Sequence, residues 1–184
     1  EFILFHAAAG GVGLIASQWA GSVGAKMIGT VSNDAKTEIA LKNGCAFTIN
    51  YKKENVVEKI KEITAGKGVP IVYDGVGKDT FYISLDSLDF RGLFVSFGQS
   101  SGMVPIVDLH KTFNPKSLYY TRPTLMHYTS TRKELEESSD LLFKKILNKE
   151  INENIFQKIN LKDAAKAHIL IQSRQSTGSI ILKS

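Results

Sequence analysis

The sequence has little that would support cross-linking, metal binding or membrane insertion. Its single cysteine, Cys45, excludes an intrachain disulfide and a metal site built from several cysteines. No apolar run approaches the roughly 20 residues of a membrane span, and the first residues lack the basic character of a signal peptide and lead into a glycine turn. The histidines are dispersed, with no Cys, Asp or Glu at metal-ligand spacing; they are His6, His110, His127 and His168. We therefore expect a metal-free cytoplasmic protein in which the histidines are structural or exposed and Cys45 is a packing residue.

The composition is that of an ordinary globular protein. Of the 184 residues, 43% are hydrophobic and 22% are charged, which suffices for a domain with a sizeable core. The net charge of +5 suits a phosphate-bearing ligand, but the Lys and Arg residues are spread along the chain. No RNA-binding motif and no row of aromatic residues between basic ones is present. Nucleic-acid binding is therefore the less favoured alternative.

Short apolar segments alternate with segments of helical periodicity along most of the chain. The predicted strands are residues 2–7, 25–31, 46–50, 69–75, 92–98 and 117–125. The predicted helices are residues 11–24, 35–43, 55–64, 80–88 and 131–147. Repeated strand–helix units with short apolar strands are typical of a parallel sheet covered on both faces. The sequence thus predicts an α/β fold with a doubly wound parallel sheet.

The turn between the first strand and the first helix has the small residues of a dinucleotide-binding turn. Ala8, Gly10 and Gly13 occupy the glycine positions of G-x-G-x-x-G, with alanine in the first. Gly10 would let the backbone approach a pyrophosphate, and Gly13 would let the helix pack closely on the strand. The N–H groups at the start of the helix would then face the phosphates. The alternative is that the glycines serve packing alone. The turn residues assigned to cofactor binding are Ala9, Gly10, Gly11, Val12 and Gly13.

The end of the second predicted strand indicates which dinucleotide is bound. NAD-binding domains usually carry Asp or Glu here, to bond the ribose 2′-hydroxyl. This chain has Ser32 and Asn33, followed by Lys36. Hydroxyl, amide and ammonium groups attract a 2′-phosphate, which a carboxylate would repel. We therefore predict NADPH as the cofactor. Asp34 is expected to cap the helix from Ala35, with a ribose contact as the alternative.

Glycines also follow the fourth and fifth predicted strands. Gly75 and Gly77 lie in "YDGVG", and Gly98 lies in "SFGQSSG". Ligands of open parallel sheets bind beyond the carboxyl ends of the strands. A flat nicotinamide ribose could lie on these turns, although they could equally be ordinary loops.

Together these motifs resemble the bacterial quinone oxidoreductases, in the zeta-crystallin-like branch of the medium-chain dehydrogenase/reductase superfamily. The resemblance covers nearly the whole chain and rests on "HAAAGGVGLIASQWA", "GAKMIGTV", "VYDGVGKDTF", "RGLFVSFGQSSG", "SLYYTRPTL" and "AHILIQSRQSTGSIIL". It implies a zinc-free enzyme that reduces quinones by hydride transfer from NADPH and works as a homodimer. An NADPH-dependent enone or enal reductase is one alternative. A non-enzymatic single-stranded RNA-binding or structural role is another.

The resemblance also implies roles for individual residues. Lys36 and Tyr51 match the family's lysine and tyrosine that hold the 2′-phosphate. The alternative is a solvated Lys36 and a half-buried surface Tyr51. Arg174 matches an arginine that reaches the cofactor from near the C-terminus.

Three further positions match family residues beside the nicotinamide. Phe97 and Gly98 match the Phe-Gly that lies by this ring. Gly75 stands where the family has a serine, so that side-chain contact is lost here. Because the cofactor's hydride does the chemistry, no catalytic acid, base or nucleophile is assigned.

The resemblance finally implies a fragment of a two-domain protein. Residues 1–150 match the dinucleotide-binding domain, and residues 151–184 match a segment returning to a GroES-like catalytic domain that is mostly absent. The sixth strand, expected to start at Ser117 and end at Leu125, should lie at the sheet edge and pair with its copy in a second chain. Pro123 should lie at its end or face away from the partner.

Overall fold

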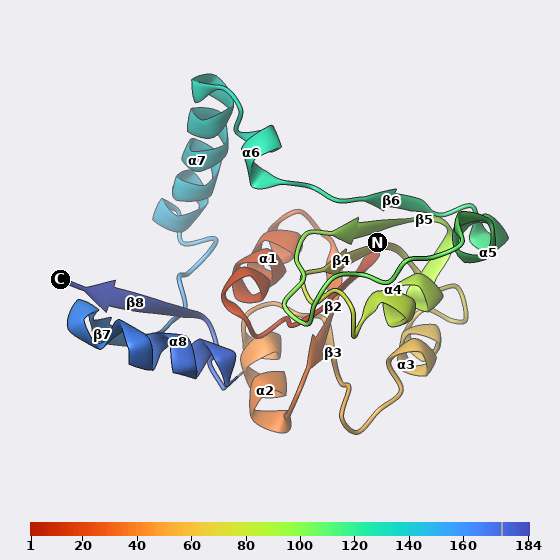
Figure 1. Ribbon diagram of the computed structural model, residues 1–184, viewed down its shortest axis with the longest axis horizontal. Helices are drawn as coiled ribbons and strands as arrows, with labels where there is room; N and C mark the ends of the chain where they lie inside the picture. The colour runs from red at the N-terminus through yellow and green to blue at the C-terminus, as the bar shows by residue number, and fades with distance from the viewer. Residues whose placement is uncertain (174) are drawn as a thin grey trace.

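The computed structural model describes residues 1–173 and 175–184 and contains a six-stranded parallel sheet (Figure 1). The strands are β1 (Phe2–Phe5), β2 (Lys26–Val31), β3 (Phe47–Asn50), β4 (Val69–Asp74), β5 (Leu88–Ser96) and β6 (Tyr119–Thr121). Their order across the sheet is β3-β2-β1-β4-β5-β6, and every neighbouring pair is parallel. This order reverses direction between β1 and β4, which confirms the predicted doubly wound fold.

The helices of this part of the chain follow the strands in alternation. They are α1 (Gly11–Ser22), α2 (Asp34–Lys42), α3 (Val56–Ile63), α4 (Phe81–Ser87), α5 (Leu109–Phe113), the 3₁₀ helix η1 (Asn114–Lys116), α6 (Leu125–Tyr128) and α7 (Arg132–Leu147). Side-chain caps fix the first residue of several helices. Asn55 Oδ1 accepts hydrogen bonds at the start of α3, and Thr131 forms a capping box with Glu134 at the start of α7. The expected Asp34 cap is wrong, because Asn33 Oδ1 accepts from the backbone N–H of Lys36 and Asp34 is the first helical residue.

Two hydrophobic layers cover the two faces of the sheet. On one face, Val56 and Ile60 of α3 and Phe81 of α4 pack with strand residues such as Leu4. On the other face, residues of α1 and α2 pack with the alternate strand residues, including Phe5 and Met27. Neighbouring residues of one strand therefore enter opposite layers, as the two-residue period of a strand requires.

Two strands, β5 and β6, differ most from their predicted bounds. β5 begins at Leu88, four residues before the predicted start, because Leu88 already pairs with Val69 and the register then shifts to match Ile71 with Leu93. β6 spans only Tyr119–Thr121, although it does lie at the expected edge of the sheet. Pro123 lies beyond its end, and a proline restricts the preceding residue and cannot donate to a strand ladder.

The remaining residues form a small parallel β-α-β unit beside α1 and α2 (Figure 1). It consists of β7 (Ile155–Asn160), the 3₁₀ helix η2 (Leu161–Asp163), α8 (Ala164–Gln172) and β8 (Ser179–Lys183). Gln18 of α1 fixes the entry to this unit, since its side-chain amide donates to the carbonyl of Asn152 and accepts from the N–H of Asn152. In the described ranges, every helix is too short or too polar to cross a bilayer.

Candidate cofactor site

A pocket of about 880 Å³ lies beyond the carboxyl ends of β1, β2 and β4, where the strand order reverses. Ala9 and Gly10 of the glycine turn, Ser32 after β2 and Val76 after β4 form parts of its wall. A doubly wound sheet places its ligand at this crevice. The pocket is therefore the candidate site for an extended, phosphate-bearing cofactor.

The glycine turn begins with a strained residue. Ala7 has a φ of +57°, the left-handed region that a residue with a Cβ rarely adopts, and its carbonyl accepts from the N–H of Gly10 at 2.9 Å. Gly10 is the N-cap of α1, and no side chain caps this helix. The first N–H groups of a helix lack intrahelical acceptors, and the helix dipole is positive at this end. The turn thus offers an anion backbone donors without a competing side chain.

The glycines of this turn face different neighbours. A Cβ on Gly13 would lie 2.5 Å from the carbonyl oxygen of Ala8, so only glycine allows α1 to sit this close to the preceding chain. A Cβ on Gly11 would lie 3.0 Å from Ser179 Oγ of the C-terminal unit. Gly10 lines the pocket, whereas Gly11, Val12 and Gly13 lie outside its wall.

A basic corner of the pocket lies at the end of β2. Ser32, Lys36 and Tyr51 all line it, and the Tyr51 side chain is exposed. Burial lowers the pKa of Lys36, and the positive charge of Lys52 lowers it further. An anion at this corner would offset both effects on Lys36. The carboxylate of Glu54 also lines the pocket.

Asn33 and Asp34, which follow Ser32, form hydrogen bonds with neighbouring residues. Asn33 caps α2 and does not line the pocket. Asp34 accepts hydrogen bonds from Lys53 Nζ and Asn50 Nδ2, and the bond from Lys53 is the main reason that its pKa is lowered. The carboxylate is therefore engaged with Lys53 beside the pocket.

The turns after β4 and β5 pack directly on one another. A Cβ on Gly75 would lie 2.9 Å from atoms of the Phe97 ring, and a Cβ on Gly98 would lie 2.5 Å from the carbonyl oxygen of Gly75. The N–H of Phe97 donates to the Asp74 carbonyl at 2.9 Å. These predicted nicotinamide residues are thus brought together, but outside the pocket wall. Arg174 lies outside the described residues.

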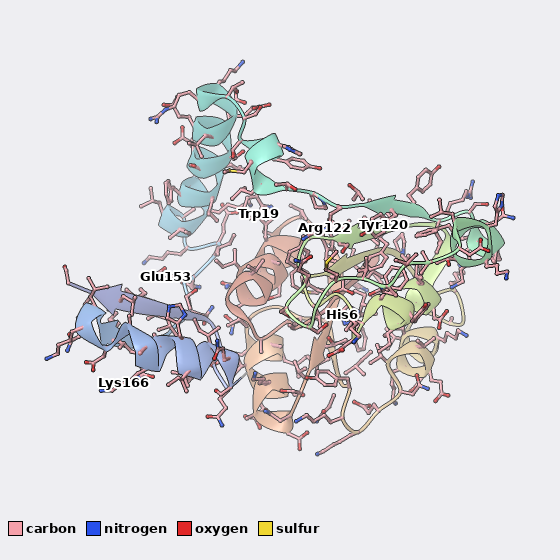
Figure 2. All side chains as sticks on the ribbon, viewed as in Figure 1. His6, Trp19, Tyr120, Arg122, Glu153 and Lys166 are labelled. Atoms are coloured by element: carbon pink, nitrogen blue, oxygen red, sulfur yellow. The ribbon has the colours of Figure 1, made fainter. Side chains whose placement is uncertain are left out.

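A buried polar row, whose members His6 and Thr30 also line the pocket, was not predicted from the sequence. His6, labelled in Figure 2, is buried in the interior of the domain. Its ring lies between Thr30 of β2 and Ser84 of α4, with Nδ1 3.1 Å from Thr30 Oγ1 and Nε2 3.1 Å from Ser84 Oγ. Ser84 Oγ donates to Asp74 Oδ2 at 2.7 Å. Asp74 also accepts from Thr80 Oγ1 and from two backbone N–H groups. Burial lowers the pKa of His6, and the charge of Asp74 opposes this only in part. The feature of the sequence that could have revealed this row is the position of His6 and Asp74 directly at strand ends.

The C-terminal unit supplies a second group of unpredicted wall residues. Ile171 and Gln172 of α8, and Ser176 after it, line the pocket. Gly178 forms a parallel bridge with Gly10, and its N–H donates to the Ala9 carbonyl at 3.1 Å. The unit is therefore hydrogen-bonded to the glycine turn itself.

Other chemically active residue types do not gather at the site. Across residues 1–173 and 175–184, no three His, Cys, Asp or Glu side chains are grouped as metal ligands. Cys45 is buried, and burial raises the pKa of its thiol to about 11, so it is protonated near neutral pH. His6 is buried, whereas His110, His127 and His168 are exposed.

Comparison with known proteins supports a cofactor-binding reading of this pocket. A family model described as "Zinc-binding dehydrogenase" matches residues 11–144. Quinone oxidoreductase 1 of Escherichia coli (strain K12) is 53% identical over 184 residues, which are 99% of this chain and 56% of that protein. 2-Haloacrylate reductase from Burkholderia sp is 43% identical, over 99% of this chain and 55% of that protein. The chain thus spans little more than half the length of these relatives.

Solved structures agree with the fold. The crystal structure of Escherichia coli quinone oxidoreductase complexed with NADPH matches with a TM-score of 0.96 at 53% identity, covering 100% of this chain and 57% of that one. The crystal structure of 2-haloacrylate reductase matches with a TM-score of 0.91 at 42% identity, covering 100% of this chain and 57% of that one.

Proposed function

Because the chain belongs to the zinc-binding dehydrogenase family, we propose that it forms the NADPH-binding part of a quinone oxidoreductase. The observation that carries the proposal is the pocket at the strand-order reversal, with an uncapped glycine turn at one wall and Lys36 at another. The match to a quinone oxidoreductase solved with NADPH supports the same cofactor.

The residues present fit this cofactor. Gly10 and the first turn of α1 would hold the pyrophosphate through backbone N–H groups. Ser32, Lys36 and Tyr51 would surround the 2′-phosphate at the basic corner. The turns with Gly75, Phe97 and Gly98 are proposed to bind the nicotinamide half. Arg174 is proposed to reach the cofactor from near the C-terminus, and Asn33 to lie beside the 2′-phosphate.

The chain's own contribution to catalysis is to bind and orient. NADPH, when bound, supplies a hydride to the acceptor. The protein holds the cofactor in one orientation and the crevice limits its contact with water. Hydride transfer itself needs no metal, and the proposal includes none. Activity of the whole protein that survives exhaustive chelation would support zinc independence, and its loss would refute it.

The proposal extends to the rest of the protein. We propose that residues 151–184 belong with a GroES-like domain that carries most of the substrate pocket, and that two chains pair through β6. A cytoplasmic location fits a chain whose one thiol, Cys45, is free.

A second acceptor class is favoured by one observation. A 2-haloacrylate reductase is 43% identical to this chain, which makes the reduction of a C=C bond conjugated to a carbonyl or carboxylate the alternative activity. Turnover of NADPH by the whole protein with a panel of quinones and of conjugated acids and enones separates the two.

The cofactor proposal is tested on the chain itself. Titration of the 184-residue protein with NADPH and NADH, followed by nicotinamide fluorescence, should show tighter binding of NADPH. Equal affinities, or no binding, would refute it.

A further inference from the structure

The strained residue at the start of the glycine turn is held by a single side chain. The Ala7 N–H donates to Thr30 Oγ1 at 3.3 Å, and Ala7 is the residue with a φ of +57°. The Thr30 carbonyl accepts from the next N–H in the turn, that of Ala8, at 3.1 Å. Thr30 therefore contacts both sides of the strained peptide, and it is itself buried in β2.

The hydroxyl of Thr30 is oriented by His6. Thr30 Oγ1 accepts from Ala7, so its own proton is available for His6 Nδ1, 3.1 Å away. Nδ1 is then an acceptor, which places the ring proton on Nε2. Nε2 donates to Ser84 Oγ, whose proton goes to Asp74 Oδ2.

The hydrogen bonds thus run in one direction from the Ala7 N–H to a carboxylate. The row joins β2, the turn directly after β1, α4 and β4, and it spans the point where the strand order reverses. Every member is satisfied, since no described buried side-chain polar atom lacks a partner. A fully satisfied polar row of this kind fixes one local geometry.

We propose that the row Thr30, His6, Ser84 and Asp74 is a positioning device for the cofactor. It holds Ala7 in the left-handed conformation, and Ala7 in turn receives the hydrogen bond from Gly10 that shapes the pyrophosphate turn. These are positioning residues, acting through the backbone of the turn. The inference rests on the proposed binding of NADPH, and it gives a role to residues to which the sequence motifs assigned none.

The test separates positioning from a general loss of packing. Thr30→Val keeps the shape of the side chain and removes the hydroxyl, so we expect the Kd for NADPH to rise about tenfold. Thr30→Ser keeps the hydroxyl and should bind nearly as the parent does. Ala7→Gly in the Thr30→Val protein should restore most of the affinity, because glycine adopts positive φ without the row. Glycine does not repair packing, so this rescue is specific to the proposed role.

A second variant covers the case in which Thr30→Val does not fold, as far-UV circular dichroism would show. Ser84→Ala breaks the row farther from the turn and should give a smaller loss, also restored by Ala7→Gly. Unchanged affinity in Thr30→Val, or failure of the glycine to restore it, overturns the inference while leaving the cofactor proposal in place. A parent chain that does not bind NADPH overturns both.

Discussion

Replacing Lys36 by alanine should discriminate between the two nicotinamide cofactors. Lys36 is half-buried in the pocket wall, and burial and the nearby charge of Lys52 already lower its pKa. A 2′-phosphate beside it would gain a charge-assisted hydrogen bond, which NADH cannot make. Removing that contact should cost about 1–3 kcal/mol, a rise in the Kd for NADPH of roughly 5- to 150-fold. The lower end is expected if solvent screens the pair.

The assay is fluorescence titration of parent and variant with NADPH and with NADH. The affinity for NADH should change by less than about twofold, because the two cofactors share every other contact. Lys53→Ala is a charge-matched control. It also removes one positive charge near α2, but Lys53 pairs with Asp34 and does not line the pocket.

The control should therefore leave NADPH binding close to that of the parent. Equal losses for NADPH and NADH in Lys36→Ala would show that Lys36 has no specific phosphate contact. Equal losses in Lys36→Ala and Lys53→Ala would show that general positive charge, not position, sets the affinity.

Three further predictions follow from the same geometry. Gly10→Val should lose NADPH binding, because the added side chain would occupy the space proposed for the pyrophosphate. Its far-UV circular dichroism should stay that of the parent, because a Cβ there meets only the Ala7 carbonyl, at 3.2 Å, and the residue's φ is −80°. Normal binding would mean that the glycine serves packing alone. Burial lowers the pKa of His6, and the charge of Asp74 opposes this only in part, so the contribution of His6 to the free energy of unfolding should be complete about one unit above pH 6.5 and be lost as the pH falls through 6.5 toward the lowered pKa. The fall is at most about 1.4 kcal/mol per pH unit, and urea unfolding that is as pH-dependent in His6→Asn as in the parent would contradict it. The chain should sediment as a dimer at tens of micromolar, because β6 leaves a strand edge of the sheet open; a monomer would show that β6 is not the interface.

Much of the fold could be predicted because its signals are local. An apolar strand followed by Gly10, Gly13 and a helical pattern can be recognised from a few consecutive residues. The early start of β5 could not be predicted, since it depends on the pairing of Leu88 with Val69 and on a register shift against β4. Such a shift depends on the neighbouring strand and leaves no local pattern. The polar row could not be predicted either, because its members are far apart in the sequence. His6 is 24 residues from Thr30 and 78 from Ser84.

The glycine turn shows why one residue type can carry several meanings. A Cβ on Gly13 would lie 2.5 Å from the Ala8 carbonyl oxygen, one on Gly11 would lie 3.0 Å from the Ser179 hydroxyl in the C-terminal unit, and Gly10 lines the pocket. The sequence shows only that each of these positions is glycine, since each cause leaves the same letter. Backbone contact with a pyrophosphate is compatible with all three, because a helix's first N–H groups point to the ligand whatever its side chains touch. The requirement for glycine at position 13 therefore comes from the protein itself. At Gly10, where a Cβ would lie 3.2 Å from the Ala7 carbonyl oxygen, the proposed pyrophosphate would add a second reason.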